Sequence, residues 1–200
     1  IEAGSNGQYF LSLSSRNQIK NTHLYSTLFI DEIKVSSIFN KKEGRNQLGY
    51  NLGGSITDIF IPYLSLGAEY TRVNPFVYSN LIPAQTYSSY SYSLGDWMGN
   101  NFDRAILFAK YTPIAKLKLV ARYQKMRKGG LGTVYEQYVV QPQPSFLFDY
   151  IKTRTDIFLQ ARYEYINNIY LTSSLTIMQT KLANGTLVKD NTYQLGISVG

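Results

Sequence analysis

The residues best suited to ligand binding are concentrated in one segment, residues 87–103. It combines the single tryptophan of the chain with several tyrosines, asparagines and aspartates. Flat aromatic rings pack against the C–H faces of sugars, and amides and carboxylates bond sugar hydroxyls. The segment therefore predicts a carbohydrate contact. The residues that we expect to make it are Tyr87, Tyr90, Tyr92, Asp96, Trp97, Asn100, Asn101 and Asp103.

Catalytic chemistry has few candidates. His23 is the only histidine and cysteine is absent, so a transition-metal site would need mostly carboxylates. A serine–histidine hydrolase of the outer-membrane phospholipase kind would have to use His23. Asp31 and Glu32 are adjacent, so on a strand they point to opposite faces and cannot pair as acid and base. We expect no enzymatic activity, no metal site and no cofactor.

The elements that must position these residues have the period of β-strands. Apolar and polar residues alternate cleanly in four segments: residues 64–74, 116–126, 155–166 and 192–199. Each apolar stripe ends or begins with a tyrosine, as the aromatic girdle of a membrane barrel requires. A soluble β-sandwich would also alternate. However, runs of about 10 to 13 residues exceed ordinary globular strands, and the polar stripes mix Lys, Arg, Glu and Gln as a wet lumen would.

The connections between these segments alternate in length. Residues 61–63, 113–115 and 167–168 look like tight turns, and residues 40–46 form an intermediate connection. Long connections are expected at residues 75–103, 127–153 and 181–191. Outer-membrane barrels have short periplasmic turns and longer outer loops. We therefore expect the long loops outside the cell and the C-terminus in the periplasm.

Nine strands are predicted in all: residues 8–16, 22–38, 47–60, 64–74, 104–113, 116–127, 154–166, 169–181 and 192–200. The predicted fold class is all-β, an antiparallel transmembrane β-barrel of the outer-membrane type forming one domain over residues 1–200. A single-chain bacterial barrel needs an even number of strands. Either one strand is miscounted or part of the barrel lies upstream. The missing signal peptide at residues 1–4 favours the second explanation.

The net charge of +7 favours an acidic partner. Basic residues on or near the polar stripes, which would form a basic lumen or rim, are Arg72, Arg104, Lys118, Arg122 and Arg162. Their field would attract an acidic polymer. Lys125, Arg127 and Lys128 fall at the outer end of their strand, so anchoring to lipopolysaccharide phosphates is an equally good interpretation. We expect no nucleic-acid partner, and the oligomeric state stays open.

Three motifs resemble a known family. Residues 69–78 (EYTRVNPFVY) are followed by a tyrosine-rich segment and then by LGDWMGNNFD at residues 94–103. Together with the strand–turn–strand at residues 111–119 and LFIDEIK at residues 28–34, they resemble the Wzi capsule-assembly family, and its members from Bacteroidetes-type bacteria most. The resemblance covers residues 24–130. Many relatives carry histidine in the tyrosine-rich loop where this chain has Ser89, Tyr90 and Ser91.

The resemblance implies an outer-membrane barrel that holds capsular polysaccharide at the cell surface as a lectin. A role of the relatives' loop histidine cannot be carried over to this chain. Two alternatives stay open: a transport pore with an anion-favouring lumen, and a loop that plugs the lumen and packs its tyrosines there without binding sugar. A barrel enzyme is the weakest interpretation, because it has one histidine to work with.

Overall fold

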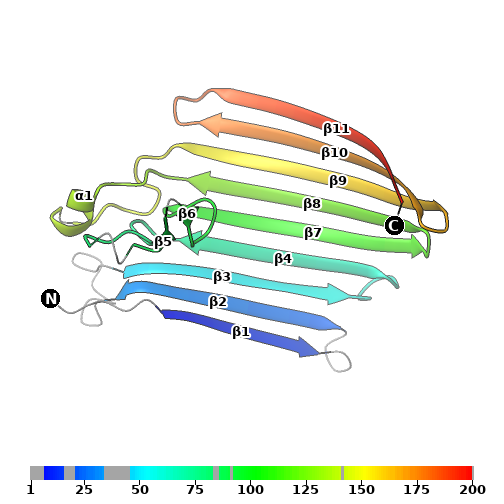
Figure 1. Cartoon of the computed structure of the whole chain (residues 1–200), viewed down its shortest axis with the longest axis horizontal. Coiled ribbons are helices and arrows are strands. Elements are labelled where there is room, and N and C mark those ends of the chain that lie inside the picture. The colour runs from blue at the N-terminus through cyan, green and yellow to red at the C-terminus, as the bar shows by residue number, and fades with distance from the viewer. Residues whose placement is uncertain are drawn as a thin grey trace.

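The computed structural model of the chain is an all-β protein built on one nine-stranded antiparallel sheet (Figure 1). It describes residues 7–15, 21–33, 46–82, 86–90, 92–140 and 142–199. In order across the sheet, the strands are β1 (Gly7–Ser15), β2 (Thr22–Ile33), β3 (Asn46–Thr57), β4 (Leu64–Val73), β7 (Phe102–Ile114), β8 (Leu117–Lys128), β9 (Lys152–Ile166), β10 (Ile169–Leu182) and β11 (Leu187–Val199). The sheet is not closed: β1 and β11 are its two edges.

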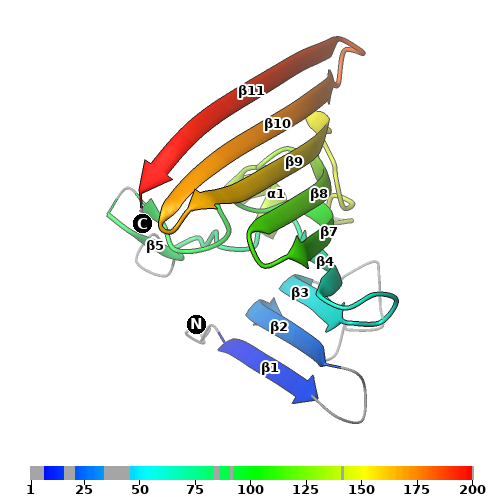
Figure 2. The same ribbon diagram turned by 90° about the vertical axis from the view of Figure 1, so that its right-hand side faces the viewer.

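The sheet curves into an open trough, and the segment bearing β5 lies on its concave side (Figure 2). Tight turns connect the strands at one end, which we call the turn end. At the other end, the loop end, residues 74–101 join β4 to β7 and residues 129–151 join β8 to β9. These two loops contain the short strands β5 (Ser88–Ser89) and β6 (Tyr92–Ser93) and the helix α1 (Val134–Tyr138).

Helix α1 is short and locally determined. Thr133 caps the N-terminus of the helix, and the Thr133 hydroxyl accepts a hydrogen bond from Glu136 N. In return, the Glu136 carboxylate accepts a hydrogen bond from Thr133 N at 2.7 Å. No helix within the described ranges is long and apolar enough to span a lipid bilayer.

The nine predicted strands are confirmed, with shifted ends. The predicted long connection at residues 181–191 is wrong: β11 begins at Leu187, and residues 183–186 form a tight hairpin around Gly185, which has φ of +85°. The Asn184-Gly185 pair favours such a turn, because glycine takes positive φ without strain. Two other predictions lie partly outside the described residues. They are the second strand, beyond residue 33, and the connection at residues 40–46, of which only residue 46 is described.

Strand pairing assigns every strand residue to one of two faces, because residues paired across an antiparallel sheet lie on the same side. One face, the apolar face, carries the stripe that includes Leu66, Ala68 and Tyr70. The other, the polar face, carries Glu69 and its partners Gly53 and Ile106. The loop of residues 74–101 covers the loop end of the polar face, where Tyr78 N donates to the Asp31 carboxylate at 2.7 Å.

The apolar face can be followed in rows of paired residues, counted from the loop end. The first two rows consist of Tyr50, Arg72, Asp103, Arg127, Thr153, Lys181 and Leu187, and of Leu52, Tyr70, Ala105, Lys125, Thr155, Gln179 and Lys189. The third row consists of Gly54, Ala68, Leu107, Tyr123, Ile157, Ile177 and Asn191, and the fourth of Ile56, Leu66, Ala109, Ala121, Leu159, Leu175 and Tyr193. The fifth row consists of Leu64, Tyr111, Leu119, Ala161, Ser173 and Leu195, and the sixth of Leu117, Tyr163, Leu171 and Ile197.

These last four rows, here called the uncharged band, contain no Asp, Glu, Lys or Arg. At about 6.7 Å between successive rows, the band spans about 20 Å along the strands. Many of its large side chains are exposed, from Ile157 at 38% to Ile197 at 75%. An exposed apolar surface of this extent needs a covering partner or a lipid environment.

The small buried core lies on the polar face, at the loop end. Phe29, Val73 and Phe102 from three strands pack with Val77 of the loop, and both Val77 and Phe102 are fully buried. Burial of these side chains fixes the loop of residues 74–101 against the sheet. The core therefore determines the position of the loop residues that the sequence selected for ligand binding.

Candidate functional site

A pocket of about 240 Å³ lies on the polar face, between strands β2, β3, β4 and β7 and the loop of residues 74–101. One wall is aromatic and the other is polar. The aromatic wall includes Phe29, Tyr78 and Tyr87, and the polar wall includes Asn51, Thr71, Asp96 and Arg104. This mixture of ring faces with hydrogen-bonding groups is typical of small-molecule and sugar sites.

The aromatic wall is held in place by ring packing and by a constrained backbone. The Phe29 ring lies 5.1 Å from both the Tyr78 and the Tyr87 rings, and the two tyrosine rings are stacked at 5.7 Å. Tyr78 has φ of 75°, a region that non-glycine residues seldom adopt. The Asp31 carboxylate, which accepts from Tyr78 N, stabilises this backbone against the strain. Burial raises the pKa of the Tyr78 phenol, so this hydroxyl stays protonated.

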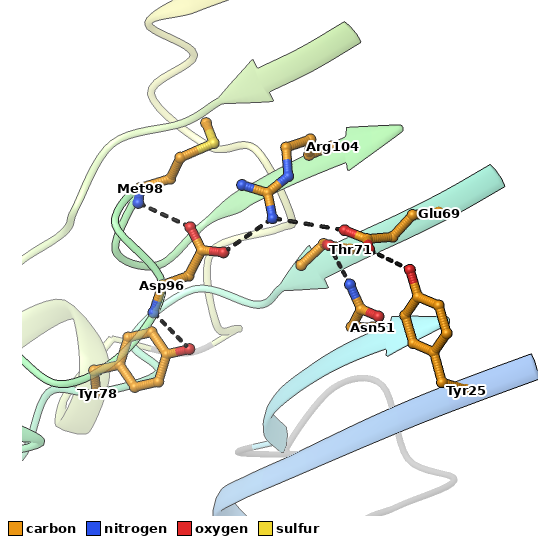
Figure 3. A network of polar contacts seen from close by, with 8 residues as sticks. All are labelled: Tyr25, Asn51, Glu69, Thr71, Tyr78, Asp96, Met98 and Arg104. Carbon is orange, nitrogen blue, oxygen red and sulfur yellow. Dashed lines mark hydrogen bonds and ion pairs between the residues drawn. The ribbon is translucent and has the colours of Figure 1, made fainter. Parts of the chain in front are cut away.

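The polar wall belongs to a network that crosses four strands (Figure 3). Arg104 Nη2 on β7 lies 3.3 Å from Asp96 Oδ2 of the loop and 3.9 Å from Glu69 Oε1 on β4. Tyr25 Oη on β2 donates to Glu69 Oε2 at 2.5 Å. Asp96 therefore reaches the sheet through a single guanidinium, and Arg104 is shared between two carboxylates.

Tyr25 reaches Glu69 because the residue between them is a glycine. Pairing places Tyr25, Gly53 and Glu69 in one row across β2, β3 and β4. A Cβ at Gly53 would overlap the Tyr25 ring. Glycine thus leaves the space over which the tyrosine lies, and the network depends on that space.

The remaining contacts of Asp96 shape the loop that closes the pocket. Its Oδ1 accepts from Met98 N at 2.9 Å, and its backbone N–H donates to Tyr78 Oη at 3.4 Å. A Cβ at Gly95 would overlap the Tyr78 ring, so this neighbour must stay small. Asp96 therefore both folds the loop and joins it to Arg104.

Two pocket-lining residues, Thr71 and Arg104, have hydrogen-bonding capacity that the described residues do not use. Arg104 Nε is buried without a hydrogen-bond partner among the described residues. Asn51 Nδ2 donates to Thr71 Oγ1 at 2.8 Å, which leaves the Thr71 hydroxyl hydrogen free to bond outward. A ligand bearing several hydroxyls could bond these groups while it packs on Tyr87. This arrangement of groups is suited to binding a polar ligand.

The structure brings only two of the eight predicted sugar-contact residues to the pocket, namely Tyr87 and Asp96. Tyr90 and Tyr92 lie on the β5–β6 hairpin and point into solvent, with exposed fractions of 101% and 78%. Trp97 is 70% exposed beyond the pocket lining. These three are exposed loop side chains and do not line the pocket.

The last three predicted residues are engaged in the protein. Asn101 is fully buried: Nδ2 donates to Gly130 O and Phe148 O, and Oδ1 accepts from Leu147 N. Asn100 is 4% exposed. Asp103 lies on the apolar face, paired with Arg127 and accepting from Tyr70 Oη at 3.1 Å. The predicted cluster is therefore not one site, because strand alternation separates Asp103 from the loop residues.

The predicted basic residues also divide between the faces. Arg104, Lys118, Arg122 and Arg162 lie on the polar face. Arg72 does not: it shares the apolar face with Tyr70, and its guanidinium lies 3.7 Å from the centre of the Phe146 ring. Among the other predicted outer-end residues, Lys125 and Arg127 are on the apolar face, whereas Lys128 is on the polar face and bonds Asn100 O.

Four functional candidates escaped sequence reasoning: Tyr25, Asn51, Glu69 and Tyr78. Tyr25 and Asn51 lie outside the quoted motifs, whereas Glu69 and Tyr78 begin and end the segment of residues 69–78. A usable signal was the Gly53-Gly54 pair inside a strand, because glycine in a strand interior marks a close approach by another group.

The single histidine is not part of the pocket. His23 Nε2 lies 2.9 Å from Ser12 Oγ near the turn end. A hydrolytic dyad also needs a group that orients the other imidazole nitrogen. The described contacts of His23 are this hydroxyl and the Tyr25 ring at 5.4 Å, and neither is such a group. Among the described residues, no three His, Asp or Glu side chains gather where a metal ion could bind.

A larger, shallow hollow of about 370 Å³ lies on the other side of the sheet. Small side chains of the uncharged band, Ala109, Ala121, Ala161 and Ser173, leave it open. It has hydrocarbon walls and no charged lining residue. Such a surface suits an acyl chain better than a sugar, so the polar-face pocket is the candidate site.

Comparison of the chain with protein-family models, with curated proteins and with solved structures finds no match.

Proposed function

We propose that the chain forms part of an outer-membrane β-barrel that binds and organises capsular polysaccharide at the cell surface, as a lectin and not as an enzyme. The observation that carries the membrane half of this proposal is the uncharged band. An exposed face without a single charge over four rows, opposite a charged and looped face, is the pattern of a lipid-facing barrel wall.

In this proposal, the long loops determine which end of the barrel faces the outside of the cell. The loops of residues 74–101 and 129–151 would lie outside the cell, and the turn end and the C-terminus of β11 would lie in the periplasm. Tyr50 and Tyr70, with ring centres 6.1 Å apart, would form part of the outer aromatic girdle. The polar-face pocket would then open toward the capsule.

The pocket supports a saccharide ligand. Tyr87 offers a ring face, while Thr71 and the Arg104 side chain line the polar wall on which hydroxyl or carboxylate oxygens would bind. The resemblance of residues 24–130 to the Wzi family supports the same ligand class and adds the capsule as its source. The outer aromatic residues Tyr90, Tyr92 and Trp97 would contact further units of the same polymer.

The charge of the polar face supports an acidic polymer. Its basic strand residues on β4 and β7–β11 are Arg104, Lys110, Lys118, Arg122, Lys128, Lys152, Arg154 and Arg162, against the acidic Glu69, Asp156, Glu164 and Asp190. This excess of positive charge within the trough would raise the local concentration of an anionic chain. Arg104 itself is balanced by Asp96 and Glu69, so the field comes mostly from the other residues.

Binding of purified capsular polysaccharide from the source bacterium to the full-length protein tests the ligand. Arg104→Gln should weaken binding about tenfold or more, because it removes the pocket donor and the partner of Asp96. Arg122→Gln is the matched control: it removes the same charge from the same face, where Arg122 stacks on Phe158 at 5.4 Å. Equal affinity of the two variants, or of both with the wild type, would reject the pocket as the site.

A transport channel is the second candidate, favoured by the basic polar face. It differs in one measurable respect, ion conductance through the full-length protein in planar bilayers. The lectin proposal expects no sustained anion-selective current, because residues 74–101 fold onto the polar face and would obstruct the lumen. Large anion-selective currents would favour the channel.

A further inference from the structure

The apolar face carries its positive charge along a single edge. Its first two rows from the loop end contain five basic residues, here called the cation belt: Arg72, Lys125, Arg127, Lys181 and Lys189. One acidic residue, Asp103, lies among them. The uncharged band begins in the very next row. Sequence alternation alone did not separate this edge from the polar face. Without the strand pairing, Arg72 was predicted on or near a polar stripe, and Lys128 was grouped with Lys125 and Arg127.

Three members of the belt are available to a ligand. Lys125, Lys181 and Lys189 are exposed, and no carboxylate among the described residues forms an ion pair with them. Arg127 is paired with Asp103, yet its side chain remains 47% exposed. The belt therefore keeps a net positive charge after its one internal pair is formed.

The spacing of the three lysines defines a compact anion site. Lys125 and Lys189 share a row in which Thr155 and Gln179 lie between them. Three strand spacings place their Cα atoms about 14 Å apart. Lys181 is one row further out. The hydroxyl of Thr155 and the amide of Gln179 add neutral hydrogen-bonding groups between the charges.

We propose that the cation belt binds the phosphate groups of an anionic outer-leaflet lipid whose acyl chains lie against the uncharged band. The occupant must be anionic at one end and apolar at the other, because the belt borders directly on the band and its shallow hollow at Ala121 and Ala161. A soluble acidic polymer would match the belt and leave the band uncovered. The proposal rests on the membrane-barrel part of the proposed function and is independent of polysaccharide binding.

Native mass spectrometry of the full-length protein in non-ionic detergent, titrated with diphosphoryl lipid A, tests the proposal. The triple variant K125Q/K181Q/K189Q removes three charges from the belt. The control K110Q/K118Q/K152Q removes three charges from the polar face, with Lys152 also at the loop end. We expect the belt variant to bind the lipid about tenfold more weakly or worse, and the control to keep wild-type affinity.

Two further arms identify the ligand chemistry. Lipid A stripped of both phosphates should bind the wild type as weakly as diphosphoryl lipid A binds the belt variant. Excess inorganic phosphate should not displace the lipid. Equal losses in the two triple variants, equal binding of the stripped lipid, or displacement by free phosphate would each overturn the proposal.

Failure of the proposed function is distinguishable from failure of the lipid site. Capsular polysaccharide should bind the belt variant with wild-type affinity, because the pocket lies on the opposite face. Loss of polysaccharide binding by the wild type with lipid selectivity intact would reject the lectin and leave the lipid site standing. A wild-type protein that fails to float with lipid vesicles would overturn the lipid site and the barrel together.

Discussion

At the scale of single residues, the site depends on a glycine in the interior of a strand, Gly53. Gly53 leaves the space through which Tyr25 reaches Glu69, and Glu69 in turn shares Arg104 with the loop residue Asp96. Asp96 and Arg104 were candidates from the sequence, whereas Glu69 and Tyr25 were not. Their connection could not be predicted, because it depends on which residues of three strands fall in one row.

Gly53→Ala tests this connection. The added methyl group overlaps the Tyr25 ring and should lower the free energy of unfolding by about 2 kcal/mol. In the double variant Gly53→Ala/Tyr25→Ala the overlap is gone, so the two losses should not add. Urea unfolding of the protein in lipid vesicles measures all three variants. Additive losses would show that the glycine and the tyrosine act independently.

Removal of one hydroxyl gives a milder test of the same network. Tyr25→Phe deletes the hydrogen bond to Glu69 and should cost about 1 to 2 kcal/mol, since the acceptor is a carboxylate. Tyr63→Phe is the matched control, because Tyr63 lies in a turn and is 70% exposed. A Tyr25→Phe variant as stable as Tyr63→Phe would mean that the short contact does not stabilise the fold.

At the scale of elements, two loops behave as one unit because Asn101 joins them. Its side chain bonds three backbone groups of residues 130, 147 and 148, and its backbone N–H donates to Asn74 O at 3.2 Å. Asn101 also has φ of 51°, a left-handed conformation that asparagine tolerates better than most residues. The residue proposed from sequence as a sugar contact is thus a structural clamp.

Asn101→Ala should release both loops together. It leaves buried backbone groups without partners and should cost about 3 kcal/mol. Hydrogen exchange should then rise in residues 74–82 and 142–151 at once. The adjacent Asn100→Ala is the control, since Asn100 is also buried but its side-chain oxygen bonds no described group. Increased exchange in only one of the two loops would contradict a shared clamp.

The elements themselves were largely predictable, and the reason is local. Period-2 alternation identified the strands, and short turns such as residues 167–168 fixed their ends. Loop contents were not predictable: β5, β6 and α1 are too short to leave a periodic pattern, and the length assumed for residues 181–191 ignored the turn at Asn184-Gly185. A hairpin signal of two residues outweighed the expected alternation of loop lengths.

At the scale of the whole molecule, the sheet separates charge by face. Sequence alternation separated the two faces in four segments, but only the pairing aligns the strands and shows that the uncharged band is continuous. Alignment also shows that the band ends at the cation belt on the loop side. The central claim is that this band faces lipid while the opposite face is wet.

Site-directed spin labelling along β9 tests that claim most directly, and the chain offers a clean background because it contains no cysteine. Single cysteines replace Ile157, Leu159 and Ala161 on the apolar face and Phe158 and Gln160 on the polar face, in full-length protein in lipid vesicles. We predict high collision rates with oxygen at the first three positions and with a water-soluble nickel chelate at the other two. Nickel access at all five positions, or the opposite alternation, would contradict the account.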